Sequence, residues 1–322
     1  MYINFPHYFI PKFCGILSLI VNPLFISALI TDKKLMFGNY RYLLISFATF
    51  NMLCSVIDSF VPMCVHNVRY AFIVFTSEGP FFDSSPFGQL ALSVRCGFIT
   101  VTYAILHAHF VYRYLVLFRN EVVSRLFLPR GLVLTFVYCF IHMITWTAVC
   151  EFFFYGDPER REYVSETFEK FYDINVEHLN MVIALYREGS HGVTVRSWIG
   201  LSIVTTTSVF SMALYFVLGY KIFHRLRSRV SSSSDKTLQM QRQLFKALAV
   251  QTLIPTCVSL LPCLAVWFTP VFLLDCRWLY LTGVIAVSVF PCLDPIVVIF
   301  FLPSLQKRLG FGNRRCVSSR GT

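Results

Sequence analysis

Three charged side chains lie inside otherwise apolar segments of this sequence: Asp58, Arg95 and Asp294. A charge inside a membrane span costs roughly 2.5–3.5 kcal/mol on insertion scales, so such groups are usually paired. Arg95 precedes Arg113 by 18 residues, or five helical turns, which places both on one helix face. Asp58 falls at a similar depth on the preceding apolar segment. We therefore predict an Asp58–Arg95 pair, which is either purely structural or also in contact with a polar ligand.

The other reactive side chains favour no enzyme. The sequence has no His-Glu-x-x-His, Gly-x-Ser-x-Gly or paired-aspartate motif, and its 11 cysteines show no metal-ligand spacing with histidine. The last apolar segment also lacks the lysine that a retinal Schiff base would need. We therefore expect no catalytic residues, no cofactor and no metal ion.

The elements that carry these residues are predicted to be membrane spans. Of the 322 residues, 56% are hydrophobic and only 14% are charged, whereas soluble domains have about 25% charged residues. A spanning helix needs about 20 mostly apolar residues. Seven segments qualify: 13–31, 42–63, 88–112, 131–150, 197–219, 247–269 and 279–302. The prediction is an all-α, seven-transmembrane helix bundle forming one domain over 1–322, with the apolar piece 70–82 placed in a loop.

Basic residues predict how the chain is oriented. The connections 32–41, 113–130 and 220–246 and the tail 303–322 hold 19 lysines and arginines, against 8 on the other side. Because cytoplasmic loops carry the excess of Lys and Arg, we expect the N-terminus outside and the C-terminus in the cytoplasm. The net charge of +11 therefore reports orientation, and no nucleic acid is expected as a partner.

Local motifs, taken in order, resemble one receptor family. They are Val21-Asn22-Pro23-Leu24, Phe37-Gly38-Asn39-Tyr40-Arg41, Tyr112-Arg113-Tyr114, Gln251-Thr252-Leu253-Ile254-Pro255 and Asp294-Pro295. With the seven spans, they are similar to the nematode serpentine chemoreceptors of the Str superfamily, most like class J. The resemblance implies a multi-pass receptor in the plasma membrane of a sensory neuron, with its ciliary membrane as a candidate location. The partners it implies are a small odorant or pheromone-like ligand, a heterotrimeric G protein and the lipid bilayer.

The resemblance also assigns switch residues near the cytoplasmic face. Arg113 resembles the arginine of the Asp-Arg-Tyr motif of rhodopsin-like receptors, but Tyr112 replaces the acid, so an acid–arginine lock does not carry over. Arg113 has two possible roles. In one, Arg113, Tyr112 and Tyr114 together couple to a G protein, and in the other, Arg113 anchors the helix to lipid headgroups. Asp294-Pro295 and Pro255 are expected flex points, because proline removes a backbone donor.

Two segments of the cytoplasmic side are candidates for modification. The serines 231–234 lie in a basic connection that would contact either a G protein or anionic lipid. Cys316 follows a short amphipathic stretch, 304–311, and is a candidate for palmitoylation.

The long connection 151–196 is the main feature expected on the outer side. Asp157 followed by Pro158 predicts the start of a helix, and the segment forms either a lid over a pocket or a cap that only helps folding. A disulfide between the third span and this connection would join Cys96 and Cys150, and a pairing that uses Cys276 is the alternative.

A seven-span ligand-gated channel or a transporter is the alternative function. Insect-type odorant receptors have the opposite orientation, against which the distribution of basic residues argues. A transporter would be expected to show internal repeats or more charges within its spans.

Overall fold

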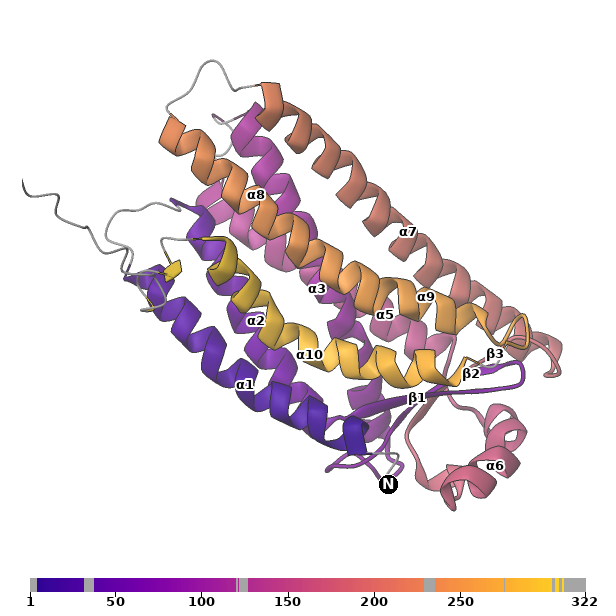
Figure 1. Ribbon diagram of the computed structural model, residues 1–322. Coiled ribbons are helices and arrows are strands. Elements are labelled where there is room, and N and C mark those ends of the chain that lie inside the picture. The colour runs from indigo at the N-terminus through magenta and orange to yellow at the C-terminus, as the bar shows by residue number, and fades with distance from the viewer. Residues whose placement is uncertain are drawn as a thin grey trace, which may run out of the picture.

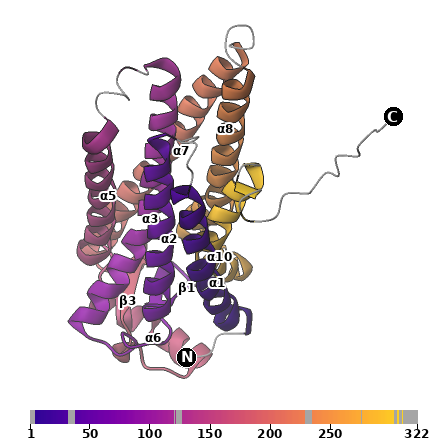
Figure 2. The same cartoon turned by 90° about the vertical axis from the view of Figure 1, so that its left-hand side faces the viewer.

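The computed structural model is a bundle of long helices with a small sheet at one end (Figures 1 and 2). It describes residues 5–31, 38–119, 121, 127–228, 235–274, 276–302, 305–306 and 309. The serines 231–234 and Cys316 lie outside these residues, as does most of the stretch 304–311. Leu305, from that stretch, is buried against the ends of the first, second and last helices.

Six helices are long and apolar enough to cross a membrane. They are α1 (Phe5–Ile30), α2 (Tyr40–Phe60), α3 (Pro86–Phe118), α5 (Leu132–Phe152), α7 (His191–Ser228) and α10 (Arg277–Phe301). A short π-helical turn, η1 (Phe127–Gly131), precedes α5. Helix α3 packs against α2, α5 and α7, and α1 packs against α2 and α10. The predicted helix bundle is confirmed.

The remaining expected span, 247–269, is an interrupted helix. It consists of α8 (Asp235–Pro255), the π-helical segment η4 (Thr256–Leu260) and α9 (Leu261–Phe268). Proline has no N–H to donate and its ring clashes with the preceding turn, so the regular hydrogen-bond pattern changes here. The helix type therefore changes directly after Pro255, and the role of Pro255 as a flex point stays a prediction.

A three-stranded antiparallel sheet covers one end of the bundle, which we call the capped end. Strand β1 (Met63–Val68) pairs with β2 (Ala71–Thr76), and β2 pairs with β3 (Met181–Leu185). The piece 70–82 lies in the connection between α2 and α3 and does not span, as expected, but the sequence did not predict that Ala71–Thr76 within it forms the central strand. Every residue of β2 and β3 is buried. Because both faces of these strands are covered, their sequences are almost continuously apolar.

The long connection contributes a helix to the same cap. Helix α6 (Pro158–Tyr172) begins at Asp157, whose side chain accepts a hydrogen bond from the Arg160 N–H, so the predicted helix start is confirmed. Its Val164 and Phe168, four residues apart, pack on the sheet. A short 3₁₀ turn, η2 (Val176–His178), then leads into β3.

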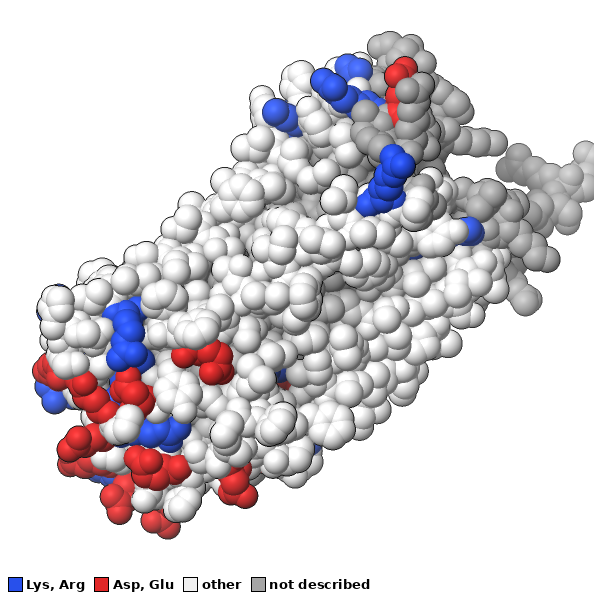
Figure 3. All heavy atoms as spheres, turned by 180° about the vertical axis from the view of Figure 1, so that it is seen from behind, with Lys and Arg blue, Asp and Glu red and all other residues white. Residues whose placement is uncertain are grey.

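The ends of the bundle differ in charge, as Figure 3 shows. Acidic side chains gather at the capped end, and helix α6 of the cap carries Glu159, Glu162 and Glu166. In this view, lysines and arginines are the main charged side chains at the opposite end, and the surface between the two ends is almost entirely uncharged. We call that opposite end the Arg113 end.

Candidate functional site

An apolar cavity lies directly under the sheet, and we call it the sheet cavity. It has a volume of about 80 Å³. Every other side chain of the strands faces it, including Phe72 and Val74 of β2 and Val182 of β3. The alternate side chains, such as Ile73 and Ile183, face α6 instead. The sheet is therefore a wall shared by two apolar clusters.

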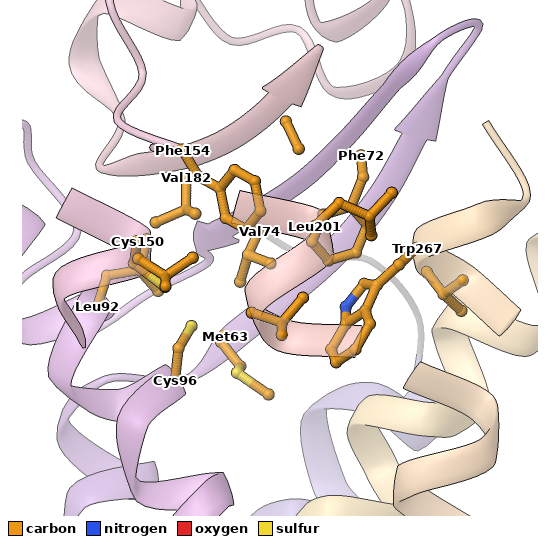
Figure 4. Packing of buried hydrophobic residues seen from close by; sticks show 14 of the residues in the cluster. Met63, Phe72, Val74, Leu92, Cys96, Cys150, Phe154, Val182, Leu201 and Trp267 are labelled. Carbon is orange, nitrogen blue, oxygen red and sulfur yellow. The ribbon is translucent and has the colours of Figure 1, made fainter. Parts of the chain in front are cut away.

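Helices close the other sides of the sheet cavity. Helix α3 provides Cys96, α5 provides Trp146, α7 provides Leu201 and α9 provides Trp267. In Figure 4 the Trp267 indole ring points into the cluster, with Phe72 and Leu201 nearby. The Trp146 and Trp267 ring centroids lie 5.5 Å apart. Such a concave, mostly apolar site is typical of small-molecule binding.

The Asp58–Arg95 pair predicted from the sequence is confirmed as a contact. The Arg95 Nη2 donates to Asp58 Oδ1 at 2.5 Å, and Nε donates to the same oxygen at 3.2 Å. Both side chains are largely buried. They border a smaller cavity of about 30 Å³, which shares Ile99 and Tyr103 with the sheet cavity. The pair itself does not line the sheet cavity, and its contact with a ligand stays a prediction.

The disulfide expected between Cys96 and Cys150 is not formed, because both residues are free cysteines, as is Cys276. The sequence was right to bring Cys96 and Cys150 together, since both line the sheet cavity (Figure 4). Both are buried in the apolar cluster. They pack there as small apolar side chains, which is how free cysteine usually behaves in a core.

Farther along the bundle, Asp294 joins three spans through a buried hydrogen-bond network. Its carboxylate accepts from Asn51 Nδ2 of α2 at 2.9 Å and from Gln251 Nε2 of α8 at 2.7 Å. Nearby, Asn22 of α1 donates to the Pro291 carbonyl of α10 at 3.0 Å. Residue 295 is a proline and has no N–H, so it cannot donate the usual helical hydrogen bond to the Pro291 carbonyl. Asn22 is therefore hydrogen-bonded to an oxygen that the helix itself leaves without its usual donor.

At the Arg113 end, Arg113 links the third span to the interrupted one. Its Nη1 donates to Gln241 Oε1 of α8 at 2.8 Å. Its guanidinium lies over the Tyr40 ring, 3.7 Å from the centroid, in a cation–π contact. The Tyr40 hydroxyl in turn hydrogen-bonds to His109 Nδ1 at 2.8 Å. Arg113 is buried, and its Nε and Nη2 have no partner among the described residues.

The two tyrosines that flank Arg113 have different surroundings. Tyr112 is buried and stacks on Tyr40, with ring centroids 5.2 Å apart. Tyr114 stacks on Phe118 at 4.6 Å and lies near Lys221 of α7. Tyr112 therefore belongs to the packing around Arg113, whereas Tyr114 faces the neighbouring helix.

Sequence reasoning missed several residues of these two sites. Tyr40 and Gln251 belong to the family motifs given above. Their residue types did not indicate that Tyr40 would contact Arg113 or that Gln251 would contact Asp294. The residues of β2 were missed because their apolar run was judged only as too short for a membrane span and was not considered as a strand. Gln241 lies in a polar stretch without any recognisable spacing.

Comparisons with a family model and with known proteins indicate the same receptor family. The family model described as "Serpentine type 7TM GPCR chemoreceptor Srj" matches residues 1–309. Serpentine receptor class J-38 of Caenorhabditis elegans is 36% identical over 94% of this chain and 91% of its own length. Serpentine receptor class r-10 of the same species is 25% identical over 91% of this chain and 86% of its own. G-protein coupled receptor str-33 is 24% identical over 82% of this chain and 78% of its own.

Proposed function

Because this chain belongs to the Srj family of serpentine seven-transmembrane chemoreceptors, we propose that it binds a small chemosensory ligand in the sheet cavity. The bound state then activates a heterotrimeric G protein at the Arg113 end. In this proposal the capped end lies outside the cell and the Arg113 end lies in the cytoplasm. The receptor resides in the plasma membrane, including the ciliary membrane of a sensory neuron.

One observation supports this proposal most strongly: a single interrupted span contributes to both sites. Its α9 portion supplies Trp267 to the sheet cavity, and its α8 portion supplies Gln241 to Arg113. The π-helical segment η4 lies between them. A ligand that repositions α9 can therefore change the contact between α8 and Arg113, because both belong to one continuous chain segment.

Arg113 has the properties that this role requires. While Gln241 and Tyr40 hold it, α8 stays against α3. When α8 moves away, the guanidinium regains free donors, which can bind carbonyl or carboxylate oxygens of a partner helix. The buried donors without a partner, Nε and Nη2, are already suited to such a partner.

The expected orientation is supported by the distribution of charge. In Figure 3 acidic side chains gather at the capped end, where basic ones accompany them, whereas basic side chains predominate at the Arg113 end. An epitope tag before residue 1 is expected to be stained in intact cells. Staining only after permeabilisation would contradict the orientation.

The direct test is ligand-evoked G-protein activation in cells that express the full chain. Replacement of Arg113 by alanine is expected to lower activation at least tenfold while ligand binding is retained. Arg119→Ala is the matched control, because it removes an exposed arginine that follows the last residue of α3. A ligand-evoked current that needs no G protein would instead favour a ligand-gated channel.

A further inference from the structure

The hydroxyl group of Tyr186 is a polar group in the wall of the sheet cavity that the apolar packing does not explain. Tyr186 follows β3, lines the cavity and is 1% exposed. Its hydroxyl has no hydrogen-bond partner among the described residues. Buried polar side-chain atoms in native proteins almost always have a partner, so this hydroxyl requires an explanation.

The rest of Tyr186 is held firmly in place. Its backbone N–H donates to the Tyr70 carbonyl at 3.1 Å, and its own carbonyl accepts from the Trp198 indole at 3.2 Å. Its ring also packs against the Trp198 ring, with centroids 5.6 Å apart. These contacts come from two different elements, so the ring cannot easily turn its hydroxyl toward solvent.

The chemical state of the hydroxyl follows from its burial. Desolvation raises the pKa of Tyr186 well above the ordinary value of tyrosine, so the group stays protonated at physiological pH. It is therefore available as a hydrogen-bond donor. Water does not fit this position well, because an ordered water needs two to four polar partners and the surrounding wall is mostly carbon and sulfur.

The cavity wall also restricts the charge of a ligand. No charged residue lines the sheet cavity among the described residues. Asp58 and Arg95, which border the adjacent smaller cavity, already neutralise each other. An ion that entered the sheet cavity would lose its hydration without gaining a counter-charge.

We propose that the ligand of the sheet cavity is a small, uncharged and mainly apolar molecule with one oxygen acceptor, such as a carbonyl or ether oxygen, which binds the Tyr186 hydroxyl. This inference rests on the proposed function only in taking the sheet cavity as the ligand site. It assigns Tyr186 as the residue that selects acceptors over plain hydrocarbons. The volume of about 80 Å³ is about half that of an engineered cavity that takes up benzene, so the ligand is small.

The test compares matched probes on the purified full chain in lipid nanodiscs. Short ketones and ethers are each paired with the hydrocarbon in which carbon replaces the oxygen, and each ketone also with the carboxylate of equal size. One such set is acetone, 2-methylpropene and acetate, each with four heavy atoms. Binding is followed by the change in tryptophan fluorescence, because Trp146 and Trp267 both line the cavity.

The expected result is that oxygen-containing probes bind more tightly than their hydrocarbon partners by about 2- to 10-fold, as one hydrogen bond provides. Tyr186→Phe is expected to abolish this preference and to leave hydrocarbon binding unchanged. Tyr163→Phe is the matched control, because it removes a hydroxyl bonded to Glu188 on the other side of the cap. Val204→Phe, which fills the cavity, is expected to weaken the binding of every probe.

Three results would overturn the inference. They are a preference that survives Tyr186→Phe, tightest binding by the carboxylate, and no saturable binding by any probe. Carboxylate binding that is lost in Arg95→Ala would point instead to the polar site predicted from the sequence and would likewise overturn the inference. The binding assay contains no G protein, so binding without cellular signalling would contradict the proposed function and leave the ligand assignment standing.

Discussion

The two ends of this bundle handle polar groups in opposite ways. At the capped end, the sheet and four helices form a cavity wall that is mostly carbon and sulfur, in which the hydroxyl of Tyr186 has no partner among the described residues. At the Arg113 end, a buried guanidinium is held by one amide and one aromatic ring, and two of its nitrogens remain without described partners. The first arrangement suits a small neutral molecule, and the second suits a protein with many acceptors.

The difference also extends to how each end is held together. The cap depends on strand pairing between segments more than 100 residues apart, such as Ile73 with Ile183. The Arg113 end depends on side chains that project from regular helices. A substitution that damages the cap should therefore reduce stability and ligand binding together, whereas one at the Arg113 end should alter signalling alone.

The largest expected effect is on the cap. Arg160 is fully buried and donates to the carbonyls of Tyr155, Phe153 and Val193 and to the Ser197 hydroxyl. Arg160→Ala leaves these acceptors unsatisfied, and we expect a loss of about 3–5 kcal/mol in stability. Thermal denaturation of the purified protein measures it. Arg187→Ala, at an exposed position of the same cap, is the control, and equal effects of the two changes would contradict the assignment.

The next effect concerns the buried ion pair between the two ends. Arg95→Ala leaves Asp58 without its partner, at a cost of roughly 2.5–3.5 kcal/mol. Surface expression, measured by flow cytometry, is therefore expected to fall. Adding Asp58→Ala is expected to restore part of it, because the uncompensated charge is then gone. Equal expression of the single and double variants would show that the pair has no stabilising role.

A smaller effect is expected at the contact between Arg113 and Gln241. A hydrogen bond to a charged group contributes about 1.5–3 kcal/mol. Gln241→Ala removes the amide that holds α8 to α3, so we expect several-fold higher G-protein activation without ligand. Ligand affinity at the capped end should change little. Unchanged basal activity together with weaker ligand binding would contradict the assignment of signalling to the Arg113 end and of binding to the capped end.

The smallest effect depends on pH and belongs to the cap surface. Hydrogen bonds from the backbone N–H and the hydroxyl of Ser190 lower the pKa of Glu159. The stabilisation is therefore present above the pKa of the unfolded chain, about 4.3, and is lost as the pH falls through the lower pKa of the folded protein. Glu159→Gln should remove this pH dependence. Melting temperatures measured between pH 3 and pH 7 would test it, and parallel curves for the two proteins would contradict it.

The sequence predicts the two ends unequally well. Span lengths and the depth of Asp58 and Arg95 follow from helical geometry, which repeats regularly along the chain. The partners of Arg113 were not predictable, because they come from helices whose rotation about their axes is set by packing.

The cap shows where sequence reasoning fails for a physical reason. A strand that is buried on both faces has no alternation of polar and apolar residues, so Ala71–Thr76 looks like a fragment of a membrane helix. Its partner Met181–Leu185 is distant in the sequence, and no local signal joins the two. By contrast, the start of α6 at Asp157 was predictable, because helix capping depends on neighbouring residues alone.

The most direct test of the central claim is whether a ligand in the sheet cavity separates α8 from α3 at the Arg113 end. Fluorescent side chains incorporated at positions 119 and 239, both exposed and near the ends of these helices, report that distance by energy transfer. Saturation with a ketone probe is expected to decrease the transfer, and Val204→Phe is expected to prevent the decrease. Unchanged transfer at a probe concentration that fully alters tryptophan fluorescence would contradict coupling between the two ends.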